Sequence, residues 1–194
     1  MASRARGLFG GTFDPPHLGH MAAARAAIDA LGLDELVVTV AGEPQQKAAK
    51  PVASAALRDE MTRAAFDGIA KVVVRDLELR RGGPTYTIDT VEALLAEAPE
   101  DALVLVVGAD AAAAMGSWHR ADDLARLVEV AIVPRPGPAA PAVPEGFSVK
   151  EVAMAPVDLS STAVRAALRE GADPASMVPP GVIRVLLTHR MYAP

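Results

Sequence analysis

The stretch LFGGTFDPPHLGH, residues 8–20, holds two of the chain's four histidines. Because side chains three positions apart share one side of a helix, a helix that begins within this stretch would hold the imidazoles of His17 and His20 side by side at its first turn. That turn has unpaired backbone N–H groups and a partial positive charge, which favour a bound anion. Gly10 and Gly11 precede it and let the backbone approach a ligand closely, since they lack a Cβ. The stretch therefore predicts a phosphate-binding turn.

Two other interpretations of the histidine pair stay open. With Asp14 nearby, the two imidazoles could hold a metal ion, although a fourth ligand is not evident. Both rings could also be hydrogen-bonded in a packed turn that is purely structural. The two common phosphate-binding sequences are absent, GxGxxG after this strand and GxxxxGK followed by Ser or Thr anywhere in the chain. Dinucleotide-dependent dehydrogenases and P-loop ATPases are therefore disfavoured.

A second candidate phosphate site lies near the end of the chain, in DLSSTAVRAAL at residues 158–168. Ser160, Ser161 and Thr162 stand at the start of a predicted helix, and Arg165 follows one turn later. One interpretation is an ordinary hydroxyl N-cap. The other is an anion site, in which hydroxyls and helix N–H groups contact phosphate oxygens and the arginine adds a charge-assisted hydrogen bond.

Further polar and aromatic side chains follow predicted strands or begin predicted helices, where they can reach the same end of a sheet. Most surface lysines are merely solvated, most threonines at a helix start are caps, and a lone tryptophan is more often part of the core. The chain's single Trp nevertheless lies in a polar stretch, GSWHRADD. These residues are Lys47; Thr85, Tyr86 and Thr87; Gly108 and Asp110; and Trp118 with His119.

Taken together, these segments resemble a known family. GGTFDPPHLGH is similar to the HxGH signature of the nucleotidylyltransferase superfamily, and DLSSTAVR resembles its second signature, ISSTxIR. The Tyr86 and Trp118 segments narrow the resemblance to bacterial nicotinate-nucleotide adenylyltransferases, along the chain from about Leu8 to Tyr192. Where that family usually has PPHK, this chain has Pro44-Gln45-Gln46-Lys47, so the lysine is kept and the histidine is not.

The resemblance implies a reaction in which ATP and nicotinate mononucleotide give deamido-NAD and pyrophosphate. It also implies a role for each matching residue. The catalytic residues would be His17, His20, Lys47 and Arg165; the ATP-binding residues Gly10, Gly11, Thr12, Phe13, Gly19, Gly108, Asp110, Ser160, Ser161 and Thr162; and the residues that bind the mononucleotide Asp14, Thr85, Tyr86, Thr87, Trp118 and His119. Mg²⁺ would be held by phosphate oxygens and water, with no protein side chain as ligand.

Two rival functions remain at this stage. One is a related adenylyltransferase that acts on nicotinamide mononucleotide or phosphopantetheine. The other is a regulatory module that binds a nucleotide without turnover. In the reaction with nicotinate mononucleotide, the attacking group is already an anionic phosphate at neutral pH. Catalysis therefore needs donors and cations that hold two anions in line more than it needs a base.

Composition limits the possible partners. The net charge is −5 and no run of Lys or Arg forms a basic stripe, so nucleic acid is not expected as a partner. The chain has no cysteine, which excludes disulfides and thiol catalysis. No apolar window reaches the roughly 18 residues that a membrane span needs, so we expect no membrane association and a cytoplasmic location. The composition is compatible with either a monomer or a homo-oligomer.

The elements that must position these residues follow from apolar runs bounded by helix-breaking residues. Runs of this kind alternate with Ala-, Leu- and charge-rich segments of helical spacing, which predicts an α/β Rossmann-like, doubly wound domain over residues 1–194. Its mainly parallel sheet should have five or six strands, with helices on both faces and a small helical part from about residue 155. The predicted strands are 7–10, 36–41, 71–79, 102–108, 128–134 and 148–153, and the predicted helices are 20–31, 54–66, 86–96, 121–127, 162–170 and 179–189, with a Pro-rich connection at 135–146. Ligands of such sheets bind beyond the carboxyl ends of the strands.

Overall fold

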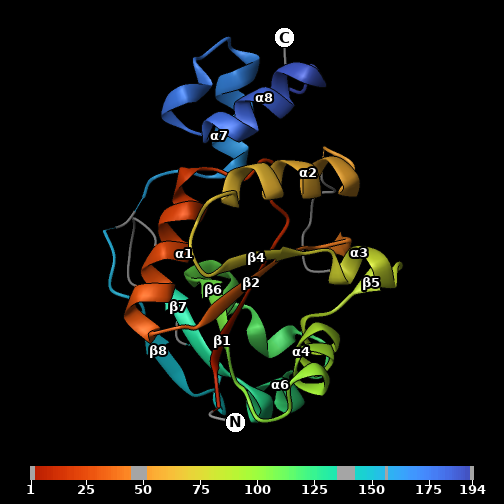
Figure 1. Ribbon diagram of the computed structural model, residues 1–194, viewed down its shortest axis with the longest axis vertical. Helices are drawn as coiled ribbons and strands as arrows, with labels where there is room; N and C mark the ends of the chain where they lie inside the picture. The colour runs from red at the N-terminus through yellow and green to blue at the C-terminus, as the bar shows by residue number, and fades with distance from the viewer. Residues whose placement is uncertain (1–2, 45–51, 135–142, 156, 193–194) are drawn as a thin grey trace.

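The structure is a computed structural model that describes residues 3–44, 52–134, 143–155 and 157–192. Within them, six parallel strands form one sheet in the order β4-β2-β1-β6-β7-β8 (Figure 1). The strands are β1 (Ala5–Gly11), β2 (Glu35–Val40), β4 (Val72–Arg75), β6 (Ala102–Gly108), β7 (Glu129–Val133) and β8 (Val149–Glu151). The strand order reverses between β1 and β6, which is where ligands bind in sheets of this kind. The predicted doubly wound sheet is confirmed.

Helices cover both faces of the sheet. Alternate residues of each strand point to opposite faces, so Phe9 and Leu8 belong to different core clusters. One cluster packs α1 (Leu18–Leu31), α2 (Ala55–Phe66) and α8 (Pro180–Thr188) on one face; the other packs α4 (Thr87–Glu97), α5 (Ala109–Ala113) and α6 (Ala121–Leu127) on the opposite face. No helix of the described part of the chain is long and apolar enough to cross a membrane.

The C-terminal part is helical, as expected. It contains α7 (Ser161–Arg169), a short 3-10 turn η2 (Pro174–Ser176) and α8, and it lies beyond α2 at one end of the molecule (Figure 1). The helices α8 and α2 approach closely because residue 181 is glycine. A Cβ there would lie 2.4 Å from the carbonyl oxygen of Ala64. This packing carries the C-terminal residues back toward the carboxyl end of β1.

One predicted strand is wrong in its second half. The apolar run at 71–79 was expected to be a single strand, but only β4 pairs with the sheet, and the chain then forms the helix α3 (Leu77–Arg81). Asp76 and Arg80 form an ion pair of 2.8 Å with helical spacing, and Glu78 turns into the protein. Charged side chains four apart favour a helical turn over the strand that the alternating Val and Leu residues predict.

Other boundaries differ by small amounts. The helix expected from His20 begins at Leu18, and the one expected from Thr162 begins at Ser161. The N-cap predicted at Ser54 is confirmed, since its hydroxyl accepts a hydrogen bond from the backbone N–H of Leu57. The short elements β3 (Glu43–Pro44), β5 (Pro84–Thr85) and η1 (Met115–Ser117) were not predicted, because two or three residues show no periodicity. Residues 135–142 of the Pro-rich connection lie outside the described residues.

Candidate active site

A cavity of about 690 Å³ opens at the carboxyl ends of β1, β2 and β6, at the point where the strand order reverses. Its lining contains predicted site residues from both ends of the chain. They are Gly10, Gly11, Thr12, Phe13, Asp14, His17, Gly19, His20, Thr85, Thr87, Gly108, Asp110, Trp118, Ser160, Ser161, Thr162 and Arg165. The structure therefore brings these segments into one site. Lys47, with Gln45 and Gln46, lies outside the described residues.

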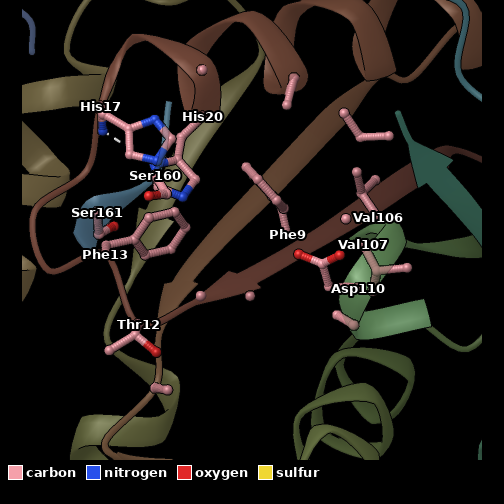
Figure 2. A pocket seen from close by; sticks show the side chains of 18 of the residues that line it. Phe9, Thr12, Phe13, His17, His20, Val106, Val107, Asp110, Ser160 and Ser161 are labelled. Carbon is pink, nitrogen blue, oxygen red and sulfur yellow. Dashed lines mark hydrogen bonds between the residues drawn. The ribbon is translucent and has the colours of Figure 1, made fainter. Parts of the chain in front are cut away.

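One end of the cavity, here called the histidine end, is formed by residues 12–20 and 160–165. His17 is the N-cap of α1, and its backbone N–H donates to Nδ1 of His20 at 3.1 Å. The two imidazoles are stacked, with ring centroids 3.7 Å apart (Figure 2). Because Nδ1 of His20 accepts a hydrogen bond, the neutral ring carries its hydrogen on Nε2 and is a donor there. His20 also contacts the ring of Phe13, at a centroid distance of 5.0 Å.

The glycine between the histidines leaves room for this stack. A Cβ at Gly19 would lie 3.0 Å from Nδ1 of His17 and 3.1 Å from its Cε1. A larger residue would push the His17 ring out of its place. Here the requirement for glycine is steric, because a side chain at this position meets a ring that is itself buried.

The second signature meets the first directly. Ser160 is the N-cap of α7 and its hydroxyl accepts from the backbone N–H of Ala163, so the expected capping role is present. Ser161 donates to the carbonyl oxygen of Pro15 at 3.0 Å. Arg165 donates from Nη1 to the carbonyl oxygen of Asp14 at 2.6 Å. The N-termini of α1 and α7 thus border one cavity, and the positive ends of two helix dipoles lie at the histidine end.

The other end of the cavity, here called the tryptophan end, is lined by Thr85, Thr87, Gly108, Asp110 and Trp118. Gly108 ends β6 and is the N-cap of α5, with Asp110 in the first turn of that helix. Tyr86 precedes α4 as its N-cap residue, and its ring contacts that of His119 at a centroid distance of 4.4 Å. Trp118 lines the cavity and packs against the core cluster that contains Ile88 and Leu94 of α4. The Trp118 side chain therefore borders this end, whereas Tyr86 and His119 contact each other and do not line the cavity.

The Asp14 carboxylate is turned into the protein. Asp14 is 3% exposed, and its oxygens accept hydrogen bonds from the backbone N–H groups of Val52 at 2.8 Å and Ala53 at 3.0 Å and from the hydroxyl of Tyr192 at 2.6 Å. Asp14 also belongs to the lining of the cavity. The contact with the mononucleotide that the resemblance implies stays a prediction, and in the structure the carboxylate already accepts three hydrogen bonds from protein donors.

Two buried charged residues near the site were missed by the sequence reasoning. Arg58 of α2 is 1% exposed and donates to the carbonyl oxygens of Thr12, Ala41, Gly42 and Ala53 at 2.7 to 3.3 Å. Burial lowers the pKa of Arg58, and the nearby Asp14 carboxylate opposes that effect. A signal was present, because Arg58 lies on the same side of the predicted helix as the apolar Met61 and Ala65.

The second is Glu78 of α3, which is 7% exposed and lines the cavity near Thr85. Its carboxylate accepts a hydrogen bond from the hydroxyl of Thr90 at 3.3 Å. Burial raises the pKa of Glu78, and hydrogen bonds from threonine hydroxyls partly oppose this rise. The sequence held no signal for it, because the segment was expected to be a strand.

Comparisons with known proteins agree with this geometry. The cytidylyltransferase-like family model matches residues 8–167. A chain from Dehalococcoides mccartyi, named a probable nicotinate-nucleotide adenylyltransferase, is 37% identical over 201 residues, covering 99% of this chain and 98% of the relative. A relative of the same name from Bordetella petrii is 39% identical over 195 residues, covering 96% of this chain and 97% of its own.

Solved structures show the same fold. The nicotinic acid mononucleotide adenylyltransferase of Plasmodium falciparum, solved in complex with NaAD, superposes with a TM-score of 0.78 at 17% identity and covers 97% of each chain. The same enzyme in complex with APC also gives a TM-score of 0.78. The sheet with its reversal at β1 and β6, the cavity there and the full-length matches lead to one conclusion: the chain belongs to the cytidylyltransferase-like nucleotidyltransferases and, within them, to the nicotinate-nucleotide adenylyltransferase family.

Proposed function

We propose that the chain transfers the adenylyl group of ATP to nicotinate mononucleotide. A phosphate oxygen of the mononucleotide would bond to the α-phosphorus of ATP as the bond from that phosphorus to the bridging oxygen of the β-phosphate breaks. The products would be deamido-NAD and pyrophosphate, and no proton need move. The observation that carries the proposal is one cavity with paired histidines and two helix N-termini at one end and the ring of Trp118 at the other.

At the histidine end, we assign His17 and His20 to the α- and β-phosphates of ATP. A histidine donates when neutral and becomes cationic as negative charge collects, so both forms stabilise the transition state. Arg165 and Lys47 would hold the β- and γ-phosphates. Gly108 and Asp110, at the end of β6, would contact the nucleoside. Backbone or hydroxyl donors of the remaining residues would complete the nucleotide site: Gly10, Gly11, Thr12, Phe13, Gly19, Ser160, Ser161 and Thr162.

At the tryptophan end, we assign Trp118 to stacking on the pyridine ring of the mononucleotide, with Tyr86 and His119 beside it. The backbone near Thr85 and Thr87, at the start of α4, would face the pyridine carboxylate, since a helix N-terminus favours an anion. Asp14 enters this proposal through its neighbours, because its carboxylate already accepts three hydrogen bonds from the protein.

Mg²⁺ fits this site as a partner of the nucleotide. The described residues contain no group of three His, Asp or Glu side chains that could hold a metal ion. Mg²⁺ commonly keeps several waters and binds substrate phosphates, so phosphate oxygens and water would supply most of its ligands. When bound, it would neutralise charge on the triphosphate and on the leaving pyrophosphate.

Pyrophosphate release tests the proposal directly. The purified chain is mixed with ATP, Mg²⁺ and one acceptor at a time: nicotinate mononucleotide, nicotinamide mononucleotide or phosphopantetheine. We expect the highest kcat/KM with nicotinate mononucleotide. Faster release with another acceptor would assign the chain to a related adenylyltransferase, and ATP binding without release on any acceptor would favour a nucleotide-sensing module.

A further inference from the structure

The hydroxyl of Tyr192 reaches the first loop of the site from the far end of the chain. Its Oη donates to Oδ1 of Asp14 at 2.6 Å, and the Tyr192 residue is 7% exposed. Burial and the Asp14 carboxylate raise the pKa of this hydroxyl, so it remains a donor at neutral pH. The contact joins residues 178 positions apart.

The same carboxylate lies close to the arginine of the second signature. Nη1 of Arg165 is 3.6 Å from Oδ2 of Asp14, longer than a direct hydrogen bond, while it donates to the Asp14 carbonyl oxygen at 2.6 Å. Its Nη2 donates to the hydroxyl of Thr162 at 3.3 Å. The guanidinium is therefore held from two sides at the edge of the cavity.

A buried carboxylate beside Arg165 competes with a phosphate for that cation. Three donors hold the carboxylate back: Tyr192 and Ala53 on Oδ1, and Val52 on Oδ2. Without the tyrosine hydroxyl, Oδ1 loses its shortest hydrogen bond, and the carboxylate can turn toward the guanidinium to replace it. The present 3.6 Å ion pair would then close to a direct, charge-assisted hydrogen bond and withdraw Arg165 from the ligand.

The backbone is in the left-handed region both at Tyr192 and at the residue before Asp14. Tyr192 has φ of 59° and Phe13, which precedes Asp14, has φ of 49°. Such left-handed conformations are uncommon for residues with bulky side chains and persist where surrounding contacts determine them. The tyrosine ring packs in the same core cluster as Phe13, which supplies those contacts.

We propose that Tyr192 is a positioning residue for nucleotide binding: its hydroxyl keeps the Asp14 carboxylate from closing on Arg165 to hydrogen-bond distance, so that the guanidinium stays available to the triphosphate. This inference rests on the proposed role of Arg165 in binding ATP. It does not depend on which acceptor the chain uses.

Tyr192→Phe tests the inference, since it removes one oxygen atom and keeps the packed ring. We expect the Kd for ATP with Mg²⁺, measured by calorimetry, to rise about tenfold, the effect of losing a hydrogen bond to a charged group. The Kd for nicotinate mononucleotide should stay within about twofold. Val185→Ala is the matched control, because Val185 is a buried residue of α8 in the same core cluster and its apolar side chain cannot hydrogen-bond to Asp14. It should lower Tm and leave both Kd values unchanged.

Arg165→Met separates positioning from packing. If Tyr192 acts through Arg165, then Tyr192→Phe added to Arg165→Met should not weaken ATP binding further, because the two effects are not additive. An additive loss, an unchanged Kd for ATP in Tyr192→Phe, or a Tyr192→Phe chain that is unfolded when Val185→Ala is folded would overturn the inference. If no acceptor releases pyrophosphate, the proposed function fails while these binding measurements still decide the role of Tyr192.

Discussion

The two ends of the cavity are built differently. At the histidine end, His17 and Asp14 are each 3% exposed, and hydrogen bonds join the first loop to α2, α7 and the C-terminal residues. At the tryptophan end, Trp118 and Tyr86 are only partly buried and meet neighbours through ring contacts. Donors aimed at developing charge stabilise it best when they do not have to reorganise. In the proposed function, the Trp118 ring would stack on the flat pyridine ring of the acceptor, a contact that tolerates small displacements.

The largest expected effect is a loss of stability on substitution of Arg58, which hydrogen-bonds to the first loop of the histidine end. Arg58→Met keeps the side-chain volume and leaves four carbonyl oxygens without their donor, so the free energy of unfolding should fall by roughly 3 kcal/mol or more. Urea denaturation measures this loss. Arg63→Met is the matched control on the same helix, because Arg63 pairs with Asp59 at the surface and such pairs contribute about 0–1 kcal/mol. Equal losses in the two variants would contradict the role given to Arg58.

The next effect is on chemistry at the same end. His20→Ala should lower kcat by about a hundredfold or more, because a donor to the transferring phosphoryl group is lost. The Kd for ATP should stay within a few-fold, since backbone donors and Arg165 remain. Turnover at the wild-type rate would remove His20 from the mechanism.

The tryptophan end should respond in binding. Trp118→Ala is expected to raise the KM for nicotinate mononucleotide about tenfold, because stacking of a ring on an aromatic side chain is worth about 1–3 kcal/mol. The KM for ATP should change little, and this provides the internal control. A KM for the mononucleotide that stays at its wild-type value would contradict the stacking assignment.

The smallest expected effect concerns Glu78, which lines the cavity near Thr85 of the tryptophan end. Burial raises the pKa of its carboxyl in the folded chain above the ordinary value of 4.5. The neutral form therefore stabilises the fold fully below pH 4.5, and this contribution is lost as the pH rises through the folded pKa. Glu78→Gln does not titrate, so the stability of the wild type relative to Glu78→Gln should fall from acid to neutral pH.

Urea denaturation at several pH values measures that difference. Glu151→Gln, at an exposed position of β8, controls for the removal of one surface charge. A difference between wild type and Glu78→Gln that is constant with pH would contradict the effect of burial on Glu78.

Much of the fold and part of the site could be predicted from local patterns. The apolar runs that became β1, β2, β6 and β7 are separated by segments of helical spacing, which was enough to indicate a parallel sheet with its ligand site at the carboxyl ends. The stacked His17 and His20 were also predictable as neighbours, because they are three positions apart at the first turn of a helix. The segment at 77–81 was not, since its Leu residues alternate as in a strand while its charged residues pair as in a helix.

The sequence by itself determined the family, the order of the elements and the two signatures, because each of these depends on residues close together in the chain. Only the tertiary structure decided where the charges of the site are held. The hydrogen bonds from Arg58 to Thr12, from Arg165 to Asp14 and from Tyr192 to Asp14 join residues 46, 151 and 178 positions apart. Local periodicity carries no information on such pairs, and the direction of the Asp14 carboxylate depends on which donors the folded chain brings to it.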